Sequence, residues 1–99
     1  MARLDLHRNR EGSFYLLDVQ ADILRGLSSR LVIPVLPLDQ APPIAGKLNP
    51  MVTIEGVRHS LVTQHMTAVS GKLLGEVVAS LVNRDNEIAG AIDLLISGI

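Results

Sequence analysis

The sequence of 99 residues contains no cysteine and no tryptophan, and its aromatic content is only 2%. The absence of cysteine excludes disulfide bonds, thiol nucleophiles and cysteine-based zinc sites. With one phenylalanine and one tyrosine, the core has to be built from aliphatic side chains, and 47% of the residues are apolar. Because a chain this short buries only about two-thirds of its unfolded surface, this apolar surplus predicts an oligomer interface.

Neither sign of charge dominates, since nine lysines and arginines face ten aspartates and glutamates, for a formal net charge of −1. This balance argues against a protein that binds nucleic acid directly as its main task. The longest apolar run, residues 31–38, contains two prolines and is far shorter than the roughly 18 residues of a membrane span. The charged, alternating start does not resemble a signal peptide. We expect a cytoplasmic protein without a membrane partner, forming one domain over residues 1–99.

Two hairpins are predicted from alternating apolar and polar residues. Residues 2–7 alternate with a period of two, and a turn cluster at 9–13 separates them from an apolar run at 14–19. The second hairpin consists of residues 51–54 and 57–63 around Glu55-Gly56, a pair that favours a tight turn.

Between the hairpins, the short apolar segment 30–36 predicts a buried strand. Pro34 places this strand near an edge or a bulge, because proline cannot donate to a ladder. Residues 37–50 contain four of the five prolines and predict a long irregular loop. Such a loop is either tolerated irregularity or a contact surface.

The last quarter of the chain predicts a helix. Asn83 is positioned to cap a helix that begins at Arg84, and Gly98 stands where a helix commonly ends in a left-handed residue. The spacing between them gives one apolar stripe, made of Ile88, Ala91, Ile92, Leu95, Ile96 and Ile99. Residues 72–82 fit a helix, a strand or an irregular segment equally well. We therefore predict a mainly β fold with a C-terminal α-helix.

No familiar catalytic motif is present. The Gly-Lys pairs at 46–47 and 71–72 are both followed by leucine, so neither forms a phosphate loop. Carboxylates such as Asp18 and Asp22 are explained as turn or capping residues. His59 and His65 would lie roughly 20 Å apart on a continuous strand, too far to share a metal. We therefore predict that the protein is not an enzyme, with no catalytic residues, metal or cofactor, and keep RNA cleavage by arginine and histidine as an alternative.

An ordered set of segments resembles the CcdB toxins over nearly the whole chain. The segments are DVQADIL at 18–24, RLVIP at 30–34, NPMV at 49–52, GEVVASL at 75–81, RDNEI at 84–88 and the terminal Gly-Ile. The resemblance implies an SH3-like barrel of the CcdB/MazF type, a homodimer, and the toxin of a type II toxin–antitoxin system that serves plasmid maintenance. Such a toxin poisons the cleaved complex of DNA with DNA gyrase through the A subunit of gyrase, and a CcdA-like antitoxin neutralises it.

The resemblance also implies two sets of contact residues. The gyrase-contact candidates are Ile23, Leu24, Asp93, Ile96, Ser97, Gly98 and Ile99. The antitoxin-contact candidates are Arg8, Arg10, Glu11 and Ile44. Apolar character alone favours burial in the core for Ile23 and Leu24. For Gly98 and Ile99, a helix cap with a frayed end is the alternative to a contact.

Three positions near the end depart from the family pattern. Ser97 stands where the family has tryptophan, Ile96 replaces a phenylalanine, and Asp93 replaces an asparagine. A buried interface tryptophan is a typical binding hot spot, which serine cannot replace. The alternatives to gyrase poisoning are therefore a relative that no longer poisons gyrase and an endoribonuclease toxin of the MazF/Kid type.

Overall fold

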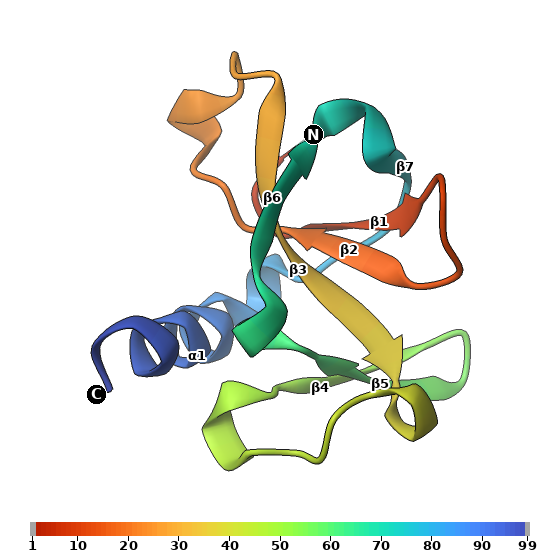
Figure 1. Cartoon of the computed structure of the whole chain (residues 1–99), viewed down its shortest axis with the longest axis vertical. Coiled ribbons are helices and arrows are strands. Elements are labelled where there is room, and N and C mark those ends of the chain that lie inside the picture. Colours follow the sequence, from red (N-terminus) through yellow and green to blue (C-terminus); the bar gives the residue numbers. More distant parts are fainter. Residues whose placement is uncertain (1, 99) are drawn as a thin grey trace.

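The strands form one strongly curved antiparallel sheet that carries a single α-helix in the described part of the chain, residues 2–98 of a computed structural model (Figure 1). The strands are β1 (Asp5–Asn9), β2 (Tyr15–Asp18), β3 (Ser29–Pro37), β4 (Met51–Ile54), β5 (Val57–Leu61), β6 (Thr67–Ser70) and β7 (Leu74–Ser80), and the helix is α1 (Asp85–Ser97). Their order in the sheet is β4-β5-β3-β2-β1-β7, and β6 pairs with β3. The predicted mainly β fold with a C-terminal helix is confirmed.

Both predicted hairpins are present. In the first, Leu6 of β1 is paired with Leu17 of β2. In the second, Glu55 and Gly56 join β4 to β5 with φ angles of 51° and 80°, so both residues are left-handed. Two left-handed residues match the twist of the flanking strands in a two-residue turn, and glycine adopts this conformation without strain. The boundaries differ from the prediction, since β1 begins at Asp5 and β5 ends at Leu61.

The strand that contains Pro34 is central, so its predicted place near an edge was wrong. Strand β3 pairs with β2 on one side and with both β6 and β5 on the other. Residues 29–32 pair with β6 and residues 35–37 pair with β5, which leaves Pro34 between the two partners. The missing N–H of proline is therefore tolerated where one partner strand replaces the other.

The segment 72–82 is mainly a strand, because β7 adds to the free edge of β1. A short 3₁₀ turn at Val82–Arg84 follows, and α1 begins at Asp85. The predicted cap at Asn83 was wrong: the N-cap is Arg84, without a side-chain cap hydrogen bond. The predicted end is confirmed, since Gly98 is left-handed with φ 75° and its N–H bonds to the carbonyl of Leu94. No helix in residues 2–98 is long and apolar enough to cross a membrane.

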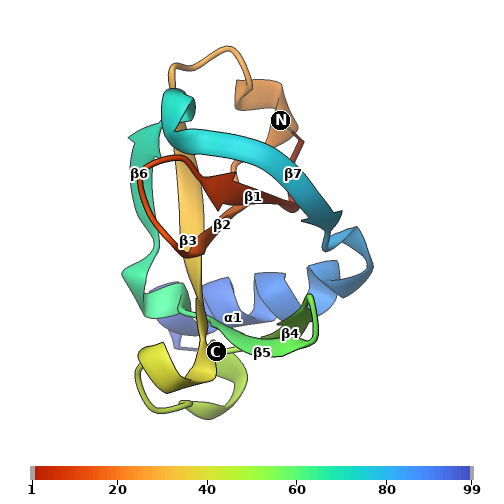
Figure 2. The same ribbon diagram turned by 90° about the vertical axis from the view of Figure 1, so that its right-hand side faces the viewer.

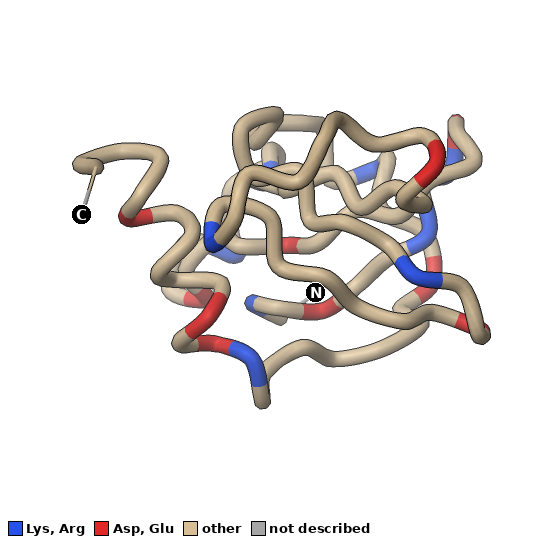
Figure 3. Tube along the Cα trace, turned by 90° about the horizontal axis from the view of Figure 1, so that it is seen from below, with Lys and Arg blue, Asp and Glu red and all other residues tan. Residues whose placement is uncertain are grey.

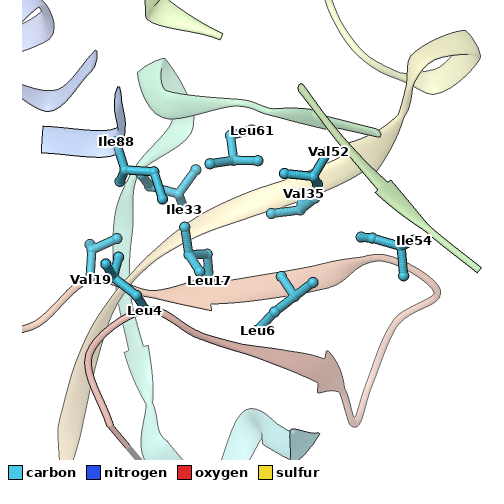
Figure 4. Close-up of a cluster of buried hydrophobic side chains, with 10 residues drawn as sticks. All are labelled: Leu4, Leu6, Leu17, Val19, Ile33, Val35, Val52, Ile54, Leu61 and Ile88. Carbon is cyan, nitrogen blue, oxygen red and sulfur yellow. The ribbon is translucent and has the colours of Figure 1, made fainter. Parts of the chain in front are cut away.

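The aliphatic core lies inside the curve of the sheet (Figure 4). Leu6, Leu17 and Ile33 come from adjacent strands, Leu61 comes from β5, and Ile88 reaches in from α1; all are at most 1% exposed. A second, smaller cluster of Leu16, Val32 and Leu74 comes from β2, β3 and β7. Strands β2 and β3 thus contribute to both clusters, which makes them a rigid support for the segment between them.

Candidate functional site

The segment between β2 and β3 presents an exposed apolar tip, which we call the fingertip (Ile23, Leu24 and Leu27). It begins with a 3₁₀ turn, η1 (Asp22–Leu24), and its three side chains are 91%, 47% and 54% exposed. The turn is held by the N–H of Leu24 on the carbonyl of Ala21 at 2.9 Å and by the N–H of Leu27 on the carbonyl of Leu24 at 3.0 Å. The burial that apolar character favoured for Ile23 and Leu24 was wrong.

The end of α1 presents a second exposed surface, the C-terminal surface (Asp93, Ile96, Ser97 and Gly98). Ile96 is 72% exposed, because the buried stripe of the helix consists of Ile88 and Ala91 nearer its start. The hydroxyl of Ser97 donates to the carbonyl of Asp93 at 2.8 Å, so it is bonded within its own helix. The remaining gyrase-contact candidate, Ile99, lies outside the described residues.

These two surfaces do not come together within one chain. The fingertip segment lies at one end of the longest axis, whereas the C-terminal end of α1 lies in the opposite half of the molecule, the half that contains β4 and β5, in both views (Figures 1 and 2). The molecule extends 33 Å along its longest axis. One partner that touches both surfaces of a single chain must therefore span most of the molecule.

A buried ion pair at the base of the fingertip was missed by the sequence analysis. Asp18, interpreted above as a turn residue, ends β2 with no exposure and accepts two hydrogen bonds from the fully buried Arg30, at 3.0 and 2.6 Å. Gln20 joins them, since its backbone N–H donates to Asp18 at 3.0 Å. The sequence offered only a partial signal: an arginine opens the apolar segment 30–36, but its pairing with β2, which brings it to Asp18, is known only from the structure.

The antitoxin-contact candidate Arg8 lies in a polar cluster, the Arg8 cluster (Arg8, Tyr15, Glu55, His59 and Glu76), in which Arg8 and the two glutamates are exposed and His59 is buried. Arg8 Nε donates to Glu76 at 2.6 Å and Nη2 donates to Glu55 at 3.2 Å. Its guanidinium lies 5.6 Å from the ring centroid of Tyr15, and that ring meets His59 edge to face at 5.4 Å. The hydrogen bond to Glu76 is the main cause that raises the pKa of Arg8. The cluster therefore holds a permanent cation over an aromatic ring, paired with two carboxylates.

The other antitoxin-contact candidates are divided between two places. Arg10 and Glu11 are exposed in the β1–β2 turn, where the N–H of Arg10 bonds to the carbonyl of Leu73. Ile44 lies in the proline-rich loop, and both views separate this loop from the turn along the long axis. There it lines a mostly apolar groove of about 800 Å³ between the loop and α1, opposite Gly90 and Leu94. The predicted antitoxin contacts therefore lie on two separate surfaces, one at the β1–β2 turn and one at the groove beside α1.

Acidic and basic residues alternate along much of the chain, and α1 carries only acidic ones (Figure 3). These are Asp85, Glu87 and Asp93. A helix with three carboxylates and no cation repels phosphate backbones, so contacts of α1 with nucleic acid are disfavoured. Two of the three histidines are buried, with His7 Nδ1 3.0 Å from the carbonyl of Gly75 and His59 Nδ1 2.9 Å from that of Val57.

Comparison with known protein families gives a match over nearly the full length of the chain. Residues 3–98 match the CcdB protein family. The chain belongs to the CcdB family. This confirms the resemblance carried by the segments at 18–24, 30–34 and 75–81.

Solved structures with the same fold include three toxins. A mycobacterial endoribonuclease in complex with its cognate antitoxin matches with a TM-score of 0.76 and 11% identity, over 97% of this chain and 94% of that one. The Mycobacterium tuberculosis toxin MazF-mt6 matches with a TM-score of 0.71 and 14% identity, over 92% and 94%. A third structure, described as an Mtb toxin, matches with a TM-score of 0.73 and 12% identity, over 92% and 99%. At such identities, the likeness establishes the CcdB/MazF fold.

These neighbours overturn the prediction that the protein is not an enzyme. That prediction rested on missing motifs, and the same fold belongs to an endoribonuclease. The lack of a phosphate loop or a nucleophile elbow is therefore no ground for excluding catalysis on this fold. Family and fold together support the toxin of a toxin–antitoxin system.

Proposed function

We propose that this CcdB-family protein is a toxin that binds the A subunit of DNA gyrase through the fingertip and the C-terminal surface and stabilises the complex of gyrase with cleaved DNA. The observation that carries the proposal is the exposure of Ile23 at 91% and of Ile96 at 72%. Both stand at positions where the resemblance implies gyrase contacts. A cluster of apolar side chains kept out of the core marks a protein-contact surface better than scattered exposure does.

The replacement of tryptophan by Ser97 predicts a weaker poison than the family pattern implies. The Ser97 hydroxyl is already bonded to Asp93, so it offers a partner little beyond a small polar surface. Asp93 adds a charge that a partner must accommodate. The fingertip, which retains Ile23 and a close substitute at Leu24, therefore contributes the larger share of the binding free energy in this chain.

The antitoxin is proposed to engage the Arg8 cluster and the groove beside Ile44. The two carboxylates paired with Arg8 outnumber it, so the cluster suits a basic side chain of an antitoxin, and the apolar groove suits its aliphatic ones. A solved neighbour bound to its cognate antitoxin supports a partner of this kind. A homodimer is part of the same proposal, since it presents each surface twice and covers part of the apolar surplus.

RNA cleavage is a second candidate, favoured by the Arg8 cluster. It combines an exposed arginine, two carboxylates and a tyrosine within contact distance. An arginine stabilises the charge that develops on a phosphate, and a carboxylate serves as a proton acceptor. The acidic α1 takes no part in this candidate function, because the cluster consists of residues from β1, β2, β5, β7 and the β4–β5 turn.

One experiment separates the two functions. The protein is titrated against gyrase with supercoiled DNA and, in parallel, against a labelled single-stranded RNA. We expect stabilised DNA cleavage that Ile23→Ser and removal of Gly98-Ile99 each weaken, whereas Val57→Ser, which changes a half-exposed side chain on β5, has no effect. RNA cleavage that Arg8→Ala abolishes, without stabilised DNA cleavage, establishes the second function instead.

A further inference from the structure

The fingertip belongs to a segment that has no hydrophobic anchor of its own. Every residue from 21 to 29 is exposed, and η1 contains no buried side chain. Such a segment would ordinarily sample many conformations, because nothing it buries offsets the entropy of ordering it. Whatever holds the fingertip in place must therefore be polar.

Two side chains anchor this segment: Asp22 accepts the N–H of Arg3 at 2.7 Å, and Gln20 bonds to the chain at two places. Gln20 is 8% exposed and lies just before the segment. Its Oε1 accepts the N–H of Leu31 at 3.0 Å, and its Nε2 donates to the carbonyl of Leu24 at 3.1 Å. The side-chain amide of Gln20, at the start of the segment, is thus bonded both to the backbone of the fingertip at Leu24 and to β3 at Leu31, just beyond the end of the segment.

The buried ion pair fixes Gln20 in turn. Asp18 accepts the backbone N–H of Gln20 with Oδ1 and both bonds from Arg30 with Oδ2. Arg30 Nη1 has no partner among the described residues, although it is buried. A buried pair with an unsatisfied donor contributes little net stability compared with apolar residues of similar size, and the best-attested use of such pairs is to select one arrangement of the chain.

We propose that Gln20, fixed by Asp18 and Arg30, is a positioning residue that holds the fingertip in its binding conformation without touching the partner. The inference rests on the proposed function of the fingertip. Preorganisation removes the ordering cost from the binding step, so the network strengthens binding through the free state of the toxin. Loss of the Gln20 amide then weakens binding although the contact residues Ile23 and Leu24 are intact.

The test uses Gln20→Met, which keeps the length of the side chain and removes both hydrogen bonds. Val52→Ala is the matched control, because it opens a cavity in the core on β4, at the opposite end of the long axis. Both variants are compared with the wild type at a temperature below their thermal unfolding midpoints. The measurements are amide hydrogen exchange and titration with the purified A subunit of gyrase. The informative amides are those of Leu24, Arg25 and Leu27, which close the local turns.

For Gln20→Met we expect faster exchange at these three amides, unchanged exchange in the paired part of β2 and β3, and roughly tenfold weaker binding to the A subunit of gyrase. Val52→Ala is expected to lower the unfolding midpoint and to leave both readouts as in the wild type. The proposal is overturned if Gln20→Met also only lowers the midpoint, with fingertip exchange and affinity unchanged, since the network then merely supports the fold.

Failure of the proposed function is recognised separately. If the A subunit of gyrase does not bind the wild type, or binds Ile23→Ser equally well, the fingertip is not a gyrase contact. The exchange of the three amides in Gln20→Met still decides whether Gln20 holds the fingertip.

Discussion

The fingertip and the C-terminal surface each expose an isoleucine, but they are held in different ways. Besides the main-chain bonds of its own turn, the fingertip is fixed by side chains, namely Gln20 on a buried ion pair and Asp22, which accepts the N–H of Arg3. The C-terminal surface is fixed by main-chain bonds of α1 and by a serine that bonds back to its own helix. Side-chain anchoring makes the shape of a surface depend on a few residues, whereas a helix end depends on the whole helix. Single substitutions should therefore separate the two surfaces.

The largest effect is expected from Arg30→Ala, which leaves the Asp18 carboxylate buried without its partner. Removal of one member of a buried pair costs about 3–5 kcal/mol, a large share of the stability of a domain this size. Urea unfolding measures the loss. The double variant Asp18→Val with Arg30→Met should regain most of it, because no buried charge remains. A double variant as unstable as Arg30→Ala would mean that packing around these positions, and not charge, is what matters.

The next largest effect is expected at the other surface, from Ser97→Trp. Because Ser97 is exposed, tryptophan can be placed there without disturbing the core. A tryptophan that becomes a binding hot spot contributes 2 kcal/mol or more, so gyrase binding should strengthen by about 30-fold. Titration with the A subunit of gyrase checks this, with Ser97→Ala as the control for the lost hydroxyl. An unchanged affinity would show that the C-terminal surface is not in contact with gyrase.

A smaller gain is expected from Gly90→Ala, which stabilises α1 and therefore acts on the C-terminal surface alone. Outside its chain neighbours and the backbone of its own helix, a Cβ at position 90 meets no atom within 4 Å, so alanine fits without a clash. Alanine is better than glycine inside a helix by about 1 kcal/mol, equivalent to a rise in the unfolding midpoint of roughly 4–8 °C for a small domain. Thermal unfolding measures it, and an unchanged midpoint would point to a helix that is already limited by its packing.

The two surfaces also differ in how much of their structure can be predicted from the sequence. The helix and its end at Gly98 follow from local signals, namely apolar spacing and the preference of glycine for left-handed backbone. The hairpins follow from alternation and from Glu55-Gly56. These features are local, so a single sequence contains the physical cause of each.

The remaining features depend on contacts between distant residues. Residues 74–80 become a strand because β1 has a free edge, although Leu74, Val77 and Val78 also fit helical spacing. Pro34 is tolerated in a central strand because two partners meet beside it. Ile23 and Leu24 are exposed because the anchors of their segment are polar. Family resemblance named them as contacts, whereas apolar character alone would have placed them in the core.

The smallest effect is expected from Arg3→Gln, which acts on a link between the two regions. Arg3 donates its backbone N–H to Asp22 at the fingertip and its Nη2 to Asp85 at the start of α1, at 2.7 and 2.9 Å. The second bond lowers the pKa of Asp85 below its ordinary value of 3.8, and partial desolvation opposes this shift. Glutamine retains the backbone bond and removes only the ion pair.

Because the folded pKa of Asp85 is lowered, its contribution to stability is present above the ordinary carboxyl pKa and is lost as the pH falls through the folded value. The wild type should therefore be slightly more stable than Arg3→Gln at pH 7, and the difference should vanish once Asp85 is protonated. Urea unfolding at several pH values, with and without added salt, measures the difference. Salt should also reduce it, since the pair is partly exposed to solvent. A difference that persists in strong acid would show that the arginine stem stabilises the link by packing, and that the two regions are joined by apolar contact and not by charge.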